Sequence, residues 1–549
     1  MIEFIAHNLA PIMFGSLILF LLLGYPVAFS LAANGLFFFV VAVELSPYSN
    51  DIALSWPLME TLSGRVLDVM RNETLLAIPF FTFMGIILEK TGMAEDLLDT
   101  IGQLFGPIRG GLAYAVILVG ALLAATTGVV AASVMAMGLI SLPIMLRYGY
   151  DRPLASGVIA ASGTLAQIIP PSLVLIVLAD QLGRSVGDMY SGAVIPGLML
   201  TALYCGYVLV MSFVAPAKVP ALPLAARTLK GSPLPLLFLL LAGLAIGFGA
   251  YRFFLPRLET GADIWAATVA VIAVYAYASL DRRFALHTLS DLAQRVVIVL
   301  VPPLALIFLV LGTIFLGIAT PTEGGAMGAT GALLMALAKR RLSYALLSEA
   351  LEATARLSSF VLFILIGSRI FSLTFYGING HVWVEELFLG LPGGVMGFMI
   401  AVNVLVFILG CFIDFFEIAF IVIPLLAPVA EKLGIDLVWF GIILAMNLQT
   451  SFLTPPFGFA LFYMRSVAPD RPYTDKVTGK VVAGIKTTDI YRGAVSFILL
   501  QVIMIFVVVL FPHLSISDAG PKVDPNSIDI QIPTIGTPDL GPPAAPSFN

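Results

Sequence analysis

One stretch of this sequence occurs twice, and the repetition limits the possible folds more than any other feature. Residues 125–171 and 410–456 align without a gap when one copy is shifted by 285 positions. The residues that then coincide are Pro143 with Pro428, Gly149 with Gly434, Asp151 with Asp436, and Pro170-Pro171 with Pro455-Pro456. Each copy contains a polar break, an apolar arm, a charged turn with glycine, a second arm, and a second break at Pro-Pro. Because proline removes a backbone donor and clashes with the preceding turn, each Pro-Pro is expected to interrupt a helix.

The apolar content of the chain indicates a membrane protein. Of 549 residues, 60% are apolar and 11% are charged, whereas about 25% charged residues are usual in a soluble domain. Apolar runs of about 20 residues, long enough to cross a bilayer as helices, recur from end to end. The short alternating segments of barrel strands do not occur. We therefore expect an all-α polytopic membrane protein, and paired broken helices in its two halves predict a transporter with its site at the breaks.

Other functional classes find little support in the sequence. No basic patch indicates nucleic-acid binding. The two cysteines, Cys205 and Cys411, lie in apolar runs, where they are interpreted as small core residues and not as a disulfide or metal pair. No nucleophile–base pair, metal cluster or phosphate-binding glycine loop points to an enzyme.

The chain is expected to have four parts. They are a first membrane half at 1–215, an inserted linker with two extra membrane helices at 216–295, a second membrane half at 296–511, and a disordered acidic, Pro-rich tail at 512–549. Within the first half, the apolar segment 9–44 is interrupted at Gly24-Tyr25-Pro26, so it forms either two short spans or one kinked span. Within the second half, an amphipathic stretch at 343–356 is expected to precede a separate span at 357–375.

Lysine and arginine predict the orientation, because they favour cytoplasmic loops. The segments expected inside contain Arg147, Arg152, Lys218 to Lys230, Arg282 to Arg295, Lys339 to Arg341 and Arg465 to Arg492. The acidic segments 46–73 and 431–436, together with the tail, are expected outside. Tracing the spans between these marks puts Gly149 inside and Gly434 outside. The two halves are therefore expected to have inverted orientations.

The breaks carry the residues expected to line the site. In hydrocarbon, unwound backbone persists only around a cavity or a bound ion. The first copy offers Thr126, Thr127, Gly128, Ser162, Gly163, Thr164, Gln167 and Pro170, and the second offers Gly410, Asp414, Asn447, Gln449, Thr450, Ser451, Thr454 and Pro455. Their hydroxyl, amide, carbonyl and carboxylate oxygens suit Na⁺, whereas helix N-termini beside the breaks suit an anion. Clusters of histidine or thiolate that would indicate zinc or copper are missing.

Four charged residues allow two interpretations each. Asp414, a carboxylate at mid-membrane, is either a Na⁺ ligand or proton carrier, or it caps a helix in the interior. Glu417 either shares that role or faces water. Glu323 in TPTEGG is either a capping-box acid or a site residue, and the capping box is the preferred interpretation. Arg369 either neutralises an acidic substrate or pairs with a buried acid. The hydroxyl and amide residues near the breaks either line the site or bond neighbouring helices.

Several motifs, taken together and in order, resemble one transporter family. They are GPIRGGLAYA at 106–115, RYGYDRPLASGVIAASGTLAQIIPPS at 147–172, GAVIPGLML at 192–200, TPTEGGA at 320–326, and GIDLVWFGIILAMNLQTSFLTPPFG at 434–458. This combination resembles the large membrane subunit of tripartite ATP-independent periplasmic (TRAP) transporters, over most of residues 9–511. The resemblance implies inverted repeats, two broken-helix hairpins, and an elevator in which a transport domain slides against a scaffold.

The same resemblance implies a function and its partners. The protein would import an organic acid, such as a 2-oxo acid, across the bacterial inner membrane by sodium symport. It would use no cofactor beyond the coupling ion Na⁺. Its partners would be a periplasmic substrate-binding protein and a small membrane subunit, expected as a separate chain. Matched position by position, the ion sites would lie at Thr126 to Gly128, Ser162 to Pro170, Gly410 to Asp414, and Asn447 to Pro455.

Departures from the family pattern leave alternatives open. The first break reads Thr127-Gly128-Val129 where relatives often have Ser-Gly-Ser, so one hydroxyl ligand of the first ion site is lost. The insertion at 216–295 and the long tail are also unusual. A stand-alone ion-coupled carboxylate carrier is the first alternative. A membrane assembly scaffold or a membrane enzyme is a further one, although a passive scaffold has no need for matched broken helices.

Overall fold

Helices make up most of the computed structural model, which describes residues 2–49, 51–229, 231–257, 261–286, 288–475 and 477–516. Among these residues, eight helices are long and apolar enough to cross a membrane. They are α3 (Val27–Leu45), α8 (Val130–Arg147), α11 (Val186–Val214), α12 (Leu234–Phe254), α13 (Ala262–Phe284), α14 (Asp291–Phe315), α16 (Tyr344–Gly377) and α23 (Thr487–Leu510). The prediction of an all-α polytopic membrane protein is confirmed.

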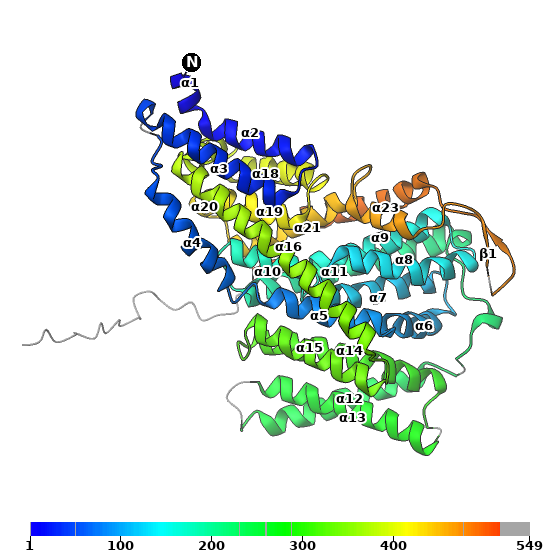
Figure 1. Ribbon diagram of the computed structural model, residues 1–549. Helices are drawn as coiled ribbons and strands as arrows, with labels where there is room; N and C mark the ends of the chain where they lie inside the picture. Colours follow the sequence, from blue (N-terminus) through cyan, green and yellow to red (C-terminus); the bar gives the residue numbers. More distant parts are fainter. Residues whose placement is uncertain are drawn as a thin grey trace, which may run out of the picture. The chain divides into compact units, whose positions relative to one another are not determined.

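Shorter helices fill the rest of the described chain (Figure 1). Two bent pairs also have the length of a span: α5 (Ala77–Lys90) with α6 (Met93–Phe105), and α17 (Gly380–Leu389) with α18 (Gly394–Gly410). The others are α1 (Ile2–His7), α2 (Leu9–Leu22), α4 (Pro57–Met70), α7 (Gly111–Thr127), α9 (Arg152–Thr164), α10 (Leu173–Gln181), α15 (Pro321–Ala338), α19 (Phe415–Ile421), α20 (Ile423–Lys432), α21 (Leu437–Phe452) and α22 (Phe459–Val467). A two-stranded ribbon, β1 (Tyr473–Thr474) with β2 (Val481–Val482), lies in the loop before α23.

The helix breaks fall where the repeated stretch predicts them. In the first copy, α7 and α8 form a re-entrant hairpin, since the Leu112 N–H at the start of α7 donates to the Tyr150 hydroxyl just beyond α8, at 3.2 Å. The tip of this hairpin is the first break, and the second break separates α9 from α10 at Pro170-Pro171. In the second copy the breaks separate α18 from α19 and α21 from α22. Each copy therefore consists of helical arms joined by a turn, α8 with α9 in the first copy and α19–α20 with α21 in the second. A helix break lies at either end of each copy.

The two copies enter from opposite sides, as the charge pattern predicts. The spanning helix α11 gives the reference. Beyond its C-terminal end, the turn between α8 and α9 is held by a 3.0 Å hydrogen bond from the Asp151 N–H to the Lys218 carbonyl. At its N-terminal end, Arg184 lies 3.8 Å from Glu431, which precedes the turn between α20 and α21. The two turns therefore lie at opposite ends of α11.

Two boundaries differ from those expected, and for segment 9–44 one of the two expected alternatives is found. The amphipathic stretch and the span expected at 343–356 and 357–375 are one 34-residue helix, α16, because no proline or glycine separates them and Ser343 caps only its start. The second half does not open at residue 296, since α14 begins at Asp291, where Ser290 caps it. The apolar segment 9–44 is two helices, α2 and α3, because the chain turns at Gly24 with a φ of +81°.

The expected tail begins later than residue 512. Residues Pro512–Leu514 form a short 3₁₀ helix, and Ser515 is fully buried. An added Cβ on Gly192 of α11 would collide with the Ser515 carbonyl, so this part of the chain packs on α11. The remainder, residues 517–549, lies outside the described residues, as does the disorder expected there.

The α12–α13 pair formed by residues 216–295 packs on α14 (Figure 1). The linker that leads to this pair is also anchored. The Gly110 N–H donates to the Val219 carbonyl at 3.0 Å, and the Leu222 N–H donates to the Gly106 carbonyl at 2.9 Å. Both bonds attach the linker to the chain between α6 and α7.

The loop before α23 is attached to the first hairpin by one ion pair. The Arg147 guanidinium contacts both oxygens of the buried Asp475 carboxylate, with the closest approach at 2.8 Å. The hydrogen bonds of Arg147 and Thr478 lower the pKa of the Asp475 carboxyl from 3.8 to about 2. The stabilisation from this shift is therefore present above about pH 4 and is lost as the pH falls towards 2.

Replacing Asp475 with asparagine is expected to lower the melting temperature at pH 7, because Arg147 then loses its ion pair. The difference from the parent protein should shrink as the pH is lowered from about 4 towards 2, where the parent carboxylate becomes protonated. Thermal unfolding of the detergent-solubilised protein measures both effects. Asp470→Asn, an exposed position in the same loop, is the matched control. Equal melting temperatures for the Asp475 and Asp470 variants would contradict the prediction.

Candidate functional site

The two breaks of the first copy meet each other. Helix α7 ends at Thr127, Gly128 adopts a φ of +60°, and α8 begins at Val130. An added Cβ on Gly128 would lie 2.8 Å from the Cγ of Leu173, the first residue of α10. The tip of the hairpin therefore contacts the chain directly after Pro170-Pro171. The side chains of Thr126 and Thr127 lie outside what the structure describes.

Polar groups of the second break in this copy are buried. Ser162 donates to the Ile159 carbonyl at 3.0 Å and packs on Gly120, so its hydroxyl is used within the helix. Gly163 packs against Val134 of α8. Gln167 is fully buried, and neither its amide nitrogen nor its amide oxygen has a partner among the described residues. Gln167 therefore has the ligand capacity that Ser162 lacks.

The breaks of the second copy also meet. Helix α18 ends at Gly410, and an added Cβ there would collide with the Ser451 hydroxyl of α21. The rings of Phe412 and Phe457, one from each break, lie 4.8 Å apart. Thus the chain on both sides of α19 to α21 converges, as it does in the first copy.

Asp414 caps a helix in the structure. Its Oδ1 accepts a 2.7 Å hydrogen bond from the Phe415 N–H, and its own N–H donates to Glu417 Oε2 at 3.1 Å. The two acids form a capping box at the start of α19, and Glu417 is buried with an exposed fraction of 8%. The capping interpretation is thus realised, and it leaves Asp414 half-buried at the break.

Helix ends give the breaks an uneven polarity. The C-termini of α7, α9, α18 and α21 end there, and the N-termini of α8, α10, α19 and α22 begin there. Helix N-termini carry partial positive charge, and C-termini carry partial negative charge. Asp414 occupies the N-terminus of α19, whereas no described side chain caps α8, α10 or α22. The positive helix ends of the first copy therefore remain open to an anion.

A buried cluster joins the two copies. Gln449 Nε2 lies 3.4 Å from both the Thr164 hydroxyl and the Tyr204 hydroxyl. Gln501 Nε2 lies 3.4 Å from the Thr164 hydroxyl and donates to the Tyr204 hydroxyl at 2.7 Å. Thr164 and Gln449 are separated by 285 positions, so equivalent residues of the two copies contact each other. Gln501 was missed from sequence, although an amide inside an apolar span was a usable signal.

Other expected site residues serve the helices in this structure. Asn447 donates to the Asn403 carbonyl at 2.7 Å, and Thr450 donates to the Met446 carbonyl at 2.8 Å. Thr454 donates to the Thr450 carbonyl at 2.8 Å. Only the Asn447 bond joins neighbouring helices, α21 and α18, because Thr450 and Thr454 donate to carbonyls four residues earlier in their own segment. Pro170-Pro171 and Pro455-Pro456, which end the two second breaks, are cis.

A cavity of about 540 Å³ opens beside the break of the second copy. Its walls include Tyr25 from the turn between α2 and α3, Arg356 from α16, and Phe412 and Glu417 from the break. Arg356 also pairs with Glu352, one turn away, at 3.0 Å. The cavity thus lies between α16 and the break that separates α18 from α19, and Arg356 is the one basic side chain in its lining.

The contacts of Glu323 and Arg369 bear on the two interpretations that the sequence left for each. Thr320 and Glu323 form a complete capping box at α15, which confirms the structural interpretation of Glu323. Arg369 is exposed on α16, and it forms no ion pair within the described part of the chain. The pairing of Arg369 with a buried acid is therefore not found there. No group of three or more His, Cys, Asp or Glu side chains arranged to hold a metal ion occurs among the described residues.

Comparison with known proteins gives consistent matches. A sequence profile described as "Tripartite ATP-independent periplasmic transporter, DctM component" matches residues 14–514. The chain is 29% identical to the C4-dicarboxylate TRAP transporter large permease protein DctM of Pseudomonas aeruginosa, over 84% of this chain and 89% of that protein. It is 27% identical to the isethionate TRAP transporter permease protein DctMQ of Oleidesulfovibrio alaskensis, over 83% of this chain and 60% of that protein.

A solved structure also has a similar fold. The Alcanivorax borkumensis YdaH transporter aligns with a TM-score of 0.51 at 12% identity, covering 89% of this chain and 100% of that one. At this identity the likeness concerns the fold alone. The two relatives are named as transporter permeases, which are not enzymes, so the expectation that this chain is not an enzyme is confirmed. The profile and the spanning helices agree on a multi-pass inner-membrane protein.

Proposed function

Because the chain belongs to the tripartite ATP-independent periplasmic transporter family as its DctM component, we propose that it imports an organic acid by sodium symport. A periplasmic binding protein would deliver the substrate, and a small membrane subunit would complete the permease. The observation that carries the proposal is the convergence of broken helices in two inverted copies. Such a constellation places ion and substrate sites at the repeat interface of secondary transporters.

Sodium as the coupling ion is supported by the donors at the breaks. The C-termini of four helices end at the breaks, which supplies oriented carbonyl oxygens. The unpartnered amide of Gln167 and the carboxylate of Asp414 add side-chain oxygens, one in each copy. Oxygen ligands suit hard cations. Each Na⁺ that moves inward down a potential of about 100 mV supplies about 2.3 kcal/mol, before any concentration difference.

An anionic substrate is supported by the polarity of the first copy and by the cavity. The uncapped N-termini of α8 and α10 present partial positive charge, and Arg356 faces the cavity beside the other break. The relatives above are named for C4-dicarboxylate and isethionate. Either the helix N-termini or Arg356 would stabilise a bound carboxylate.

An elevator movement would carry this site across the membrane. The helix α16 packs on α3, where Thr374 donates to the Gly35 carbonyl at 2.8 Å, and these helices would belong to the scaffold. Between α16 and α19, the structure describes one side-chain hydrogen bond, in which the Ser368 hydroxyl donates to the Phe420 carbonyl at 2.6 Å. Ion and substrate that stabilise the same movable state would be coupled.

Uptake into proteoliposomes tests the proposal. Vesicles would contain this chain, its small subunit and its binding protein, and would be offered labelled organic acids. We expect uptake only with an inward Na⁺ gradient and only with the binding protein present. Na⁺ would stabilise the transporting state, and the binding protein would deliver the substrate to it. Uptake driven by a proton gradient alone would exclude sodium coupling. Uptake without the binding protein would favour a stand-alone carboxylate carrier.

A further inference from the structure

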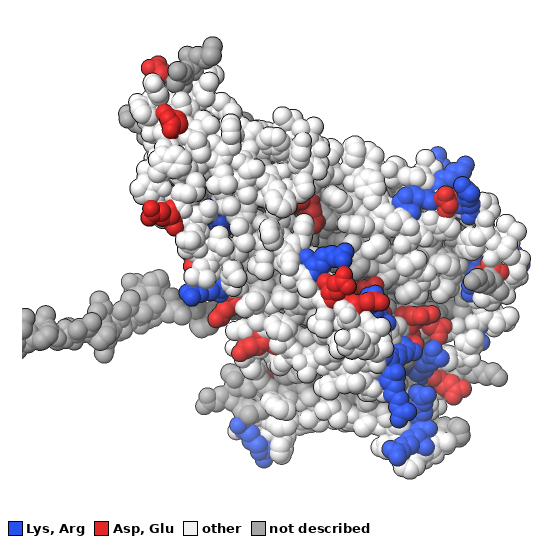
Figure 2. All heavy atoms as spheres, viewed as in Figure 1, with Lys and Arg blue, Asp and Glu red and all other residues white. Residues whose placement is uncertain are grey.

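A basic cleft lies at one end of the helices α6, α13, α14 and α15, away from the breaks. Its volume is about 620 Å³. The charged side chains in its lining are Arg282, Arg295, Lys339, Arg341, Asp96 and Asp291. Four cations thus face two carboxylates. Figure 2 shows this end as a group of blue side chains with some red among them, at the lower right of the view.

The carboxylates do not neutralise the cleft. Asp96 is shared, at 2.8 Å from Arg341 and 3.6 Å from Lys339. Arg295 pairs outside the lining, with Asp99 at 2.9 Å. Arg282 is exposed, and no carboxylate of the described chain lies within 4.0 Å of its guanidinium nitrogens.

The buried acid next to Arg282 is already occupied. Asp281 is fully buried and accepts hydrogen bonds from Thr288, Leu289 and Gln294. It therefore holds the turn between α13 and α14 and does not face the cleft. The cleft therefore retains positive charge at this end of the helices.

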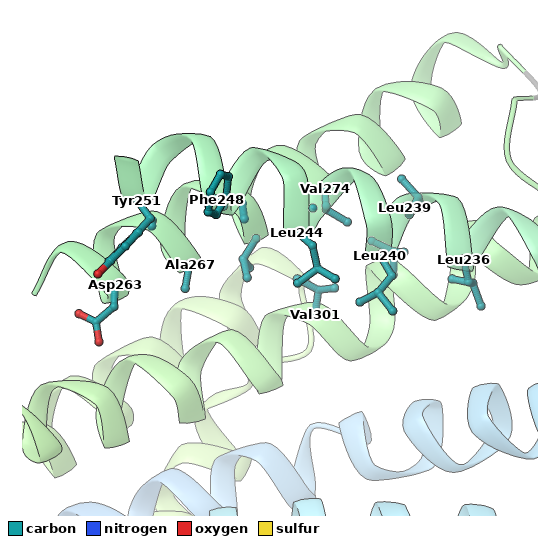
Figure 3. Close-up of a pocket in the computed structure, with 16 residues that line it drawn as sticks. Leu236, Leu239, Leu240, Leu244, Phe248, Tyr251, Asp263, Ala267, Val274 and Val301 are labelled. Carbon is teal, nitrogen blue, oxygen red and sulfur yellow. The ribbon is translucent and has the colours of Figure 1, made fainter. Parts of the chain in front are cut away.

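An apolar groove begins beside the cleft. The groove, of about 840 Å³, runs between α12, α13 and α14 (Figure 3). On α14, Val297 and Val301 of the groove lie three residues after Gln294 and Ile298 of the cleft, so the two features share one face of the helix. Leu236 lies at one end of the groove and Asp263 at the other. The acidic end is therefore the end away from the cleft.

The groove is long enough to hold an acyl chain. Leu236 and Tyr251, which line the groove along α12, are 15 residues apart, or about 22 Å along a helix. One leaflet of the hydrocarbon core is about 15 Å thick. Because lysine and arginine favour the cytoplasmic side, the cleft lies at the headgroup level of the inner leaflet. Basic pockets between membrane helices on this side bind phospholipid headgroups.

We propose that the cleft and groove form a binding site for an anionic phospholipid, with its phosphate at Arg282 and an acyl chain between α12, α13 and α14. The chemistry recognised in the cleft is a phosphate. The groove assigns its source to a lipid, because a soluble phosphate has no use for an apolar channel. The α12–α13 pair would thus be fixed to α14 partly through a bound lipid.

Native mass spectrometry of the delipidated full chain, titrated with phosphatidylglycerol or cardiolipin, tests this site. We expect a saturable lipid adduct that Arg282→Gln weakens about fivefold, the effect of one basic residue at a lipid surface. Arg283→Gln is the matched control, because it makes the same change one residue along the same helix, outside the cleft lining. Equal loss in both variants, or in neither, would overturn the proposal.

Two further arms separate headgroup from acyl chain. Ala267→Phe fills the groove without changing charge, and we expect it to reduce the lipid adduct as well. An adduct unaffected by Ala267→Phe would overturn the groove assignment. Inorganic phosphate should produce no adduct and no rise in melting temperature, whereas the lipid should raise it. A rise with inorganic phosphate equal to that with lipid would make the ligand a soluble anion and overturn the lipid proposal.

Discussion

Replacing Asp414 with asparagine is expected to reduce sodium-driven uptake by at least about tenfold, a loss of ~1.4 kcal/mol. Asparagine caps helices as well as aspartate does, so α19 should keep its start while the break loses its negative charge. If the carboxylate contributes to the Na⁺ site, the Na⁺ concentration needed for half-maximal uptake should rise. Uptake in proteoliposomes at graded external Na⁺ measures the change.

The alanine variant separates capping from ion binding. Asp414→Ala removes both the charge and the cap, so it should also lower thermal stability, by about 1 kcal/mol for a lost N-cap. Asp414→Asn should melt like the parent protein. Full uptake in Asp414→Asn together with poor uptake in Asp414→Ala would mean that Asp414 serves only as a cap. In that case the proposed ion site of the second copy would lose its carboxylate.

Replacing Gly493 with alanine is expected to disrupt the contact between α9 and α23. An added Cβ on Gly493 would collide with the Pro153 carbonyl, and one on Gly157 would collide with the Gly493 carbonyl. Both obstacles are backbone atoms, so the helices must separate. Overpacking of this kind costs about 1–3 kcal/mol or more, which exceeds the gain of about 1 kcal/mol from alanine in a helix. Melting temperature and the yield of monodisperse protein should both fall.

A second glycine provides the control for this prediction. Gly206 lies in α11, and an added Cβ there would meet no atom within 4 Å. Gly206→Ala should therefore leave the melting temperature unchanged or raise it slightly. If Gly493→Ala behaves in the same way, the close approach of α9 and α23 does not contribute to stability.

The helix breaks and caps could be predicted from the sequence. Pro170-Pro171, Pro455-Pro456 and Gly128 interrupt helices as expected, because proline lacks a donor and a φ of +60° favours glycine. Pro302-Pro303, in contrast, lies within the continuous helix α14. The Thr320–Glu323 capping box followed from residue type and spacing in the same way. The inverted orientation of the copies followed from the distribution of lysine and arginine.

Contacts between distant segments could not be predicted. Nothing in the sequence pairs Gln501 with Tyr204 or brings Arg356 to the break of the second copy, since these contacts depend on how helices pack. The continuity of α16 also escaped prediction, because an amphipathic turn and an apolar span join without a boundary residue. Two of the residues proposed as ligands, Ser162 and Thr450, donate their hydroxyl hydrogens to carbonyls of their own helices, which residue type alone does not reveal.

The contact between Thr164 and Gln449 also distinguishes a chain with two copies from a dimer of identical halves. In two copies related by an approximate two-fold axis, a residue that touches its own counterpart lies close to that axis. In a dimer of identical half-length proteins, the same place would join a residue to itself, and both copies would carry one residue type. A single chain that contains both copies is free of that restriction. A hydroxyl can then face an amide across the axis, and each half becomes free to specialise.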